Sequence, residues 1–122
     1  MNTLTSLLFV PAAALLTTSA FWVAPLRAHA DSAYGCLYPY ACIYRDPGLR
    51  GGIVARFQVV TSGWQSVTAR GFSAYNTRND DIVYLFTRTE NHWSEVCMGP
   101  NAWGEVGPTP IQGIRIDSRS SC

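Results

Sequence analysis

The side chains that could carry chemistry in this chain are four cysteines, two histidines and eight acidic residues. All four cysteines lie beyond residue 30, and an even number in a short secreted chain predicts two disulfides. Of the three possible pairings, we favour Cys36 with Cys42 and Cys97 with Cys122. Pro39 bends the chain between the first two, and the second pair would pin the carboxyl end. A zinc site is not expected, because there is no Cys-x-x-Cys spacing and only one histidine beyond residue 30.

Catalysis would need an acid or base beside a partner group, and the sequence offers little for it. His92 is the only histidine beyond residue 30, and its neighbours Asn91 and Trp93 place it in a hairpin, where an exposed turn residue is the simpler interpretation. A carboxylate pair for glycoside hydrolysis could be drawn from four acidic residues, but any acidic surface would offer as many: Glu90, Glu95, Glu105 and Asp117. We therefore expect neither an enzyme nor a bound cofactor.

Residues 1–30 have the pattern of a signal peptide. An apolar stretch from Leu4 to Val23 is followed by Ala28-His29-Ala30, the small-x-small pattern that signal peptidase cuts. Pro11 and Pro25 interrupt or flank the apolar stretch, which disfavours a transmembrane anchor. We expect cleavage after Ala30 and a secreted domain of residues 31–122 with no integral membrane segment.

The charge of this domain is balanced. Of nine basic residues only Arg27 lies in the first 30, so nine minus one, or eight, accompany eight acidic residues. A neutral domain is a poor match for nucleic acid or an anionic membrane, and neither is expected as a partner.

Apolar residues beyond residue 30 recur with a period of two, which indicates an all-β fold. In the segment 53–60 one face is expected to carry four apolar side chains, as in a half-buried strand: Ile53, Ala55, Phe57 and Val59. The segment 81–88 is apolar on both faces and indicates a central strand covered on two sides, and a last strand is expected around Ile114 and Ile116. Shorter candidates, separated by Gly-, Pro- and Asn-containing turns, are 41–46, 64–68 and 93–98.

The chain also repeats itself. Ile43-Tyr44 corresponds to Leu85-Phe86, and Trp64-Gln65-Ser66-Val67 corresponds to Trp103-Gly104-Glu105-Val106 in the same order. Two units, about 36–80 and 81–122, predict paired Greek keys packed as a two-sheet, disulfide-stapled sandwich. Within the first unit we expect the ring of Tyr44 to cover Gly51, because only glycine gives positive φ without a side chain under the ring.

Several short motifs resemble a known group of proteins. They are Cys36 to Cys42, Ile43-Tyr44, Gly51-Gly52, Phe57, Gly63-Trp64 and Gly71-Phe72. Together they resemble the βγ-crystallin-like secreted peptidase-inhibitor family related to the Streptomyces metalloproteinase inhibitor. The resemblance implies a Greek-key fold and inhibition of an extracellular protease, and covers most of residues 34–122.

The resemblance also implies a position for the inhibitory loop. In the inhibitor that names the family, an apolar residue just after a disulfide-bonded cysteine faces the metalloprotease pocket. The segment Val96-Cys97-Met98-Gly99-Pro100 has this form, with Met98 as the apolar residue and Pro100 stiffening the loop. The competing interpretation is that Val96 and Met98 are core residues of a strand.

Two further expectations concern ligands. The calcium-binding pattern of the wider crystallin group is missing, because Asp80-Asp81 runs into Val83-Tyr84 where Ser or Thr followed by Ser would be needed. We interpret Asn79, Asp80 and Asp81 as a polar turn before a strand, with weak binding of a cation as the alternative. The alternative to inhibition is a surface module that binds protein or carbohydrate. Its candidate residues are aromatic: Tyr34, Tyr38, Tyr40, Trp93 and Trp103.

Overall fold

The computed structural model describes residues 31–122, and the predicted signal peptide lies outside this range. These residues form an all-β fold, as predicted, and contain no helix that could cross a membrane. The strands are β1 (Ala41–Asp46), β2 (Arg50–Phe57), β3 (Gln65–Ser66), β4 (Ser73–Asn76), β5 (Ile82–Thr89), β6 (His92–Met98), β7 (Trp103–Glu105) and β8 (Gly113–Asp117).

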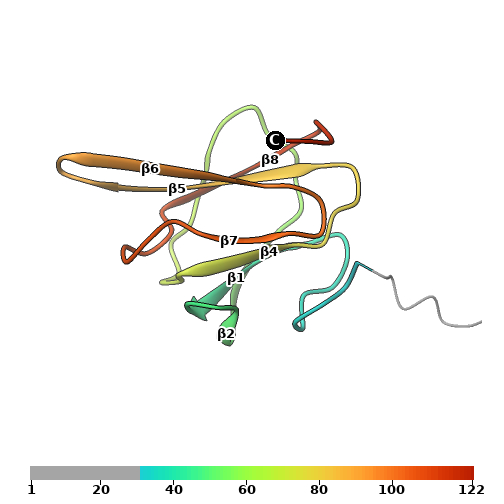
Figure 1. Cartoon of the computed structure of the whole chain (residues 1–122), viewed down its shortest axis with the longest axis horizontal. Helices are drawn as coiled ribbons and strands as arrows, with labels where there is room; N and C mark the ends of the chain where they lie inside the picture. The colour runs from blue at the N-terminus through green and yellow to red at the C-terminus, as the bar shows by residue number, and fades with distance from the viewer. Residues whose placement is uncertain (1–30) are drawn as a thin grey trace, which may run out of the picture.

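The strands form two four-stranded antiparallel sheets. The first sheet has the order β2-β1-β4-β7 and the second the order β3-β8-β5-β6. In Figure 1 the first sheet lies below the second. Each sheet thus takes three strands from one half of the chain and the third strand of the other half. This order is compatible with the predicted pair of Greek keys.

The main hydrophobic core lies between the two sheets. On β5 the side chains of Val83 and Leu85 are fully buried, whereas Tyr84 and Phe86, which alternate with them, are only partly buried on the opposite face. The β5 strand is central, between β8 and β6, as predicted. Both sheets and their connections contribute to the core: Ala41, Ile43, Ala74, Val83, Leu85, Met98, Val106, Ile111, Ile114 and Ile116.

A second, smaller cluster covers the other face of β1. It contains both cysteines of the Cys36–Cys42 disulfide together with Tyr44 and Tyr75. The second disulfide joins Cys97 to Cys122, so both bonds connect the pairs favoured from the sequence. Because β1 is buried on both faces, the first sheet is covered by the core on one side and by the segment before β1 on the other.

The expected contact between Tyr44 and Gly51 is wrong, although Gly51 does have positive φ, at 79°. A Cβ at Gly51 would lie 2.7 Å from Cγ of Asp46 and 2.8 Å from Nε of Arg45, not against a ring. The ladder of β1 with β2 is irregular on both sides of Tyr44, which pairs with Ile53. The Tyr44 ring therefore joins the small cluster, and its hydroxyl donates to the Tyr34 carbonyl at 2.8 Å.

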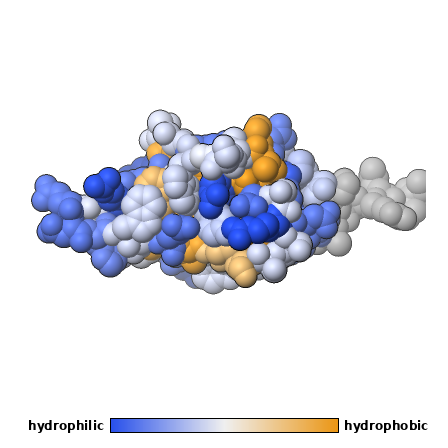
Figure 2. All heavy atoms as spheres, turned by 90° about the horizontal axis from the view of Figure 1, so that it is seen from above, coloured by the Kyte–Doolittle hydropathy of each residue, from blue (hydrophilic) through white to orange (hydrophobic). Residues whose placement is uncertain are grey.

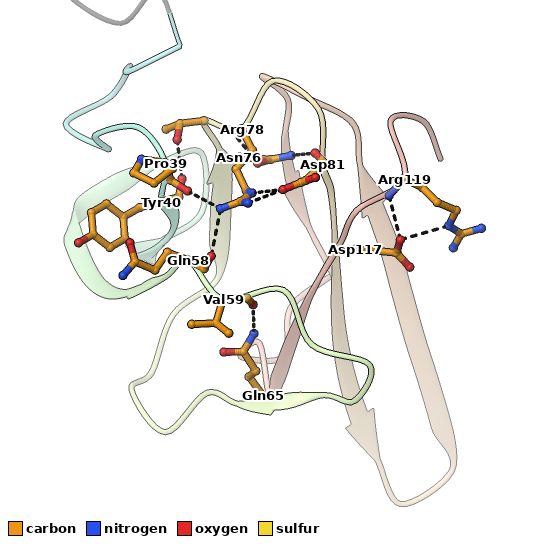
Figure 3. A network of polar contacts seen from close by, with 11 residues as sticks. Pro39, Tyr40, Gln58, Val59, Gln65, Asn76, Arg78, Asp81, Asp117 and Arg119 are labelled. Carbon is orange, nitrogen blue, oxygen red and sulfur yellow. Dashed lines mark hydrogen bonds and ion pairs between the residues drawn. The ribbon is translucent and has the colours of Figure 1, made fainter.

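A guanidinium group ties the loops at one end of the sandwich together (Figure 3). Arg78, between β4 and β5, donates from Nε to Oδ2 of Asp81 at 2.6 Å. Its Nη1 donates to the carbonyls of Pro39 at 3.1 Å and Gln58 at 3.0 Å. Three separate segments therefore depend on one half-buried side chain for their hydrogen bonds.

Candidate functional site

The loop assigned to inhibition by the resemblance is not a surface loop. Val96, Cys97 and Met98 are the last residues of β6, and Met98 pairs with Val83 on the buried face of β5. Only 1% of Met98 is exposed, so its side chain lies in the core and the strand-core interpretation holds. Gly99 and Pro100 follow the strand in a partly buried turn. A protease pocket cannot receive a side chain that is buried between the sheets.

An exposed apolar side chain does follow a disulfide-bonded cysteine elsewhere. Leu37 comes directly after Cys36, is 64% exposed, and lies in the short segment that the Cys36–Cys42 bond closes. The backbone of this segment is fixed on both sides of Leu37. Cys36 N–H donates to the Ala33 carbonyl at 2.8 Å, and Tyr40 N–H donates to the Leu37 carbonyl at 2.9 Å. We refer to residues 36–42 as the first-disulfide loop.

The sequence contained a signal for this loop. Cys36-Leu37 has the same cysteine-then-apolar form as Cys97-Met98, and in addition its second cysteine is close by. The prediction for the Cys97 segment was wrong because Met98 lies in a strand, where alternation turns its side chain into the core. Leu37 precedes β1 and has no strand partner in the described structure. The backbone N–H of the next residue, Tyr38, donates to Oγ of Ser32 at 2.8 Å.

Aromatic side chains gather on the outer face of the second sheet, the side from which Figure 2 is viewed. We call the cluster of Trp64, Tyr84, Phe86, Trp93 and Arg115 the ring face. The Phe86 and Trp93 rings are stacked, with centroids 4.5 Å apart and an interplanar angle of 7°. The Trp64 ring meets both of them edge-on, at 4.6 Å and 6.2 Å. These rings come from separate positions along the chain and were not grouped from the sequence.

A guanidinium group lies on the same face. The Arg115 Cζ atom is 4.5 Å from the centroid of the Tyr84 ring and 5.4 Å from that of Trp64. A guanidinium nitrogen of Arg115 also lies 3.7 Å from a carboxylate oxygen of Asp117. The pKa of Asp117 is held below its usual value by a hydrogen bond from the backbone N–H of Arg119 and by the guanidinium groups of Arg119 and Arg115. Beside Arg115 is an open hollow of about 390 Å³, lined by Val60, Thr61, Ser62, Arg115, Asp117 and Ser118.

The remaining predicted residues are dispersed. His92 is exposed at the start of β6, near the tip of the β5–β6 hairpin that projects beyond the other strands in Figure 1. Trp103 is 53% exposed on β7, in the other sheet from the ring face. Asn79 is hydrogen-bonded to Asp31 and Asn101, and Asp81 to Arg78. Within residues 31–122 no three His, Cys, Asp or Glu side chains lie close enough together to hold a metal ion.

Comparisons with protein-family models, with curated proteins and with solved structures find no match for this chain.

Proposed function

We propose that the protein is a secreted inhibitor of an extracellular metalloprotease and acts through the first-disulfide loop. The observation that carries this proposal is the 64% exposure of Leu37 directly after Cys36. This proposal keeps the function that the resemblance implies but assigns it to the first-disulfide loop in place of the segment 96–100. The two disulfides support the extracellular setting, because such bonds persist in oxidising compartments.

The loop has the physical properties that a protease inhibitor needs. A flexible peptide loses conformational entropy when it enters a cleft, whereas a loop that is already fixed loses less. Here the two ends of the loop are joined by a disulfide whose cysteines are fully buried, and a hydrogen bond from Tyr40 N–H to the Leu37 carbonyl holds the backbone between them. The apolar side chain of Leu37 is 64% exposed and therefore accessible to an apolar pocket of the protease.

The test is a titration of a thermolysin-like metalloprotease with the oxidised protein. Wild type should inhibit stoichiometrically, and a protease already blocked at its active site should not bind. Leu37→Asp should weaken inhibition at least 30-fold, the equivalent of about 2 kcal/mol for the loss of a central apolar anchor.

Val59→Asp is the matched control, since Val59 is also an exposed aliphatic residue, at 58%, but lies beyond β2. It should inhibit like wild type. Absence of inhibition by intact wild-type protein, or equal inhibition by Leu37→Asp and wild type, would exclude this role for the loop.

A further inference from the structure

We propose that the ring face is a second binding site, which takes a neutral polysaccharide by stacking a pyranose ring on Trp93. This inference does not depend on protease inhibition. It uses the opposite layer of the sandwich, because the first-disulfide loop packs against the first sheet, whereas the ring face is on the outer side of the second.

Folding accounts for part of the ring face. Phe86 pairs with Gly113 across β5 and β8, and its ring covers that glycine so closely that a Cβ there would lie 2.5 Å from Cδ1 and 2.8 Å from Cζ. Trp64 then packs edge-on against Phe86. Both rings are partly buried and shield the sheet from water. Their positions need no ligand.

Folding does not account for Trp93 in the same way. It lies on β6, an edge strand of the second sheet, and remains 46% exposed. One face of its indole is stacked on Phe86, so the opposite face is the one open to solvent. The indole N–H donates to Oε2 of Glu95 at 3.3 Å, which fixes the orientation of the ring. An indole held in this way loses little entropy on binding and offers one flat, free face.

A pyranose ring is a suitable occupant of such a face. Its axial C–H groups carry slight positive charge and meet the negative face of an aromatic ring, while its hydroxyl groups need hydrogen-bonding partners at the ring edge. Glu95 lies at the edge of Trp93 and uses only one oxygen on the indole in the described contacts. Further along the face, the hollow beside Arg115 is lined by hydroxyl, carboxylate and guanidinium groups that hydroxyl-rich ligands can bond. Arg115 pairs with Tyr84, four residues along β5 from the Arg88 that pairs with Trp93, so the hollow gives space for a more distant sugar of the same chain.

The charges of the face indicate that the ligand is neutral. Arg115 and Arg119 lie 3.7 Å and 3.4 Å from Asp117, and Glu95 at the edge of Trp93 supplies a second carboxylate, so two carboxylates accompany these two guanidinium groups. Around Arg115 and Arg119 a polyanion would therefore find no excess of positive charge.

The test is retention of the whole oxidised protein on insoluble cellulose, chitin and xylan, with immobilised polygalacturonate as the anionic comparison. Wild type should be retained by at least one neutral polymer and not by polygalacturonate. The matching soluble oligosaccharide should change the tryptophan fluorescence as it covers Trp93. Trp93→Ala should weaken binding at least tenfold, and Trp93→Phe, which keeps a flat ring, should recover part of it.

Trp103→Ala is the matched control, because Trp103 is a tryptophan on the other sheet that is slightly more exposed than Trp93, at 53% against 46%. It should bind like wild type, and so should Leu37→Asp. Circular dichroism spectra that match wild type would show that each variant is folded. Lack of retention on all three neutral polymers, stronger retention on polygalacturonate, or equal losses in Trp93→Ala and Trp103→Ala would each overturn the proposal.

Discussion

The packing of Phe86 over Gly113 gives a prediction in which two physical effects have opposite signs. Glycine inside a strand normally weakens it, and alanine at a site with ordinary φ stabilises a protein by about 0.4–1 kcal/mol. At Gly113, however, a methyl group would overlap the Phe86 ring, with contacts of 2.5 Å and 2.8 Å to two ring carbons and a closer one to Cε1. We therefore expect Gly113→Ala to destabilise the fold.

The expected loss is about 2 kcal/mol, in the range of overpacked cores. For a domain of this size that loss lowers Tm by roughly 8–16 °C. The ring cannot yield without also disturbing its stack on Trp93 and its edge contact with Trp64. Near-ultraviolet circular dichroism should accordingly change together with the stability.

A double-mutant cycle isolates the cause, with urea and thermal unfolding as the assays. In a Phe86→Ala background the overlap is gone, so the further change Gly113→Ala should be neutral or stabilising. If Gly113→Ala alone raises the stability, or costs the same with and without the Phe86 ring, then the ring does not determine the choice of glycine and the reasoning fails.

Other predictions follow from the disulfides, a buried tyrosine and the loop network. Replacing Cys97 and Cys122 by alanine should cost about 3.5 kcal/mol in urea unfolding by the chain-entropy model; a loss below 1 kcal/mol would contradict that model here. Burial raises the pKa of Tyr44 from 10.0 to about 12, so this group stabilises the fold fully below pH 10 and its contribution falls as the pH rises through 12. Urea unfolding between pH 8 and 12 should show a smaller alkaline loss in Tyr44→Phe than in wild type, and equal losses would argue against this assignment. Arg78→Met should cost about 2 kcal/mol, because Asp81 and two carbonyls lose their donor; thermal unfolding with an unchanged Tm would exclude that role.

The longer strands and the disulfide pairs could be predicted because their signals are local. Alternation in 53–57 and the apolar run of 82–86 extend over enough residues to define a face, and Cys36 and Cys42 are too close in sequence for their pairing to depend on the rest of the fold. By contrast β4 and β7 are short, and β4 includes two polar residues that are fully buried, Ser73 and Asn76. They are strands because β4 pairs with β1 and β7 pairs with β4, which local patterning cannot reveal.

The site predictions failed where they depended on which way a side chain faces. Met98 and Leu37 both follow a disulfide-bonded cysteine, but Met98 lies within a strand whose register turns it inward. The position of Tyr44 could not be predicted from its spacing to Gly51. The pairing of β1 with β2 is irregular on both sides of Tyr44, and these irregularities place Tyr44 opposite Ile53. The ring face was not expected for a similar reason: Trp64, Phe86 and Trp93 meet only through pairing between strands.

Because β3 lies in the second sheet and β7 in the first, the two halves of the chain should stay associated even if the backbone between them is cut. Each half of the chain completes a sheet of the other, and neither disulfide crosses the connection between β4 and β5. A nick in that connection would leave two fragments, each closed by its own covalent bond, that remain associated through shared ladders. The disulfide of each fragment could be formed separately before the two fragments are mixed. Their reassembly would then measure the affinity of one half of the chain for the other.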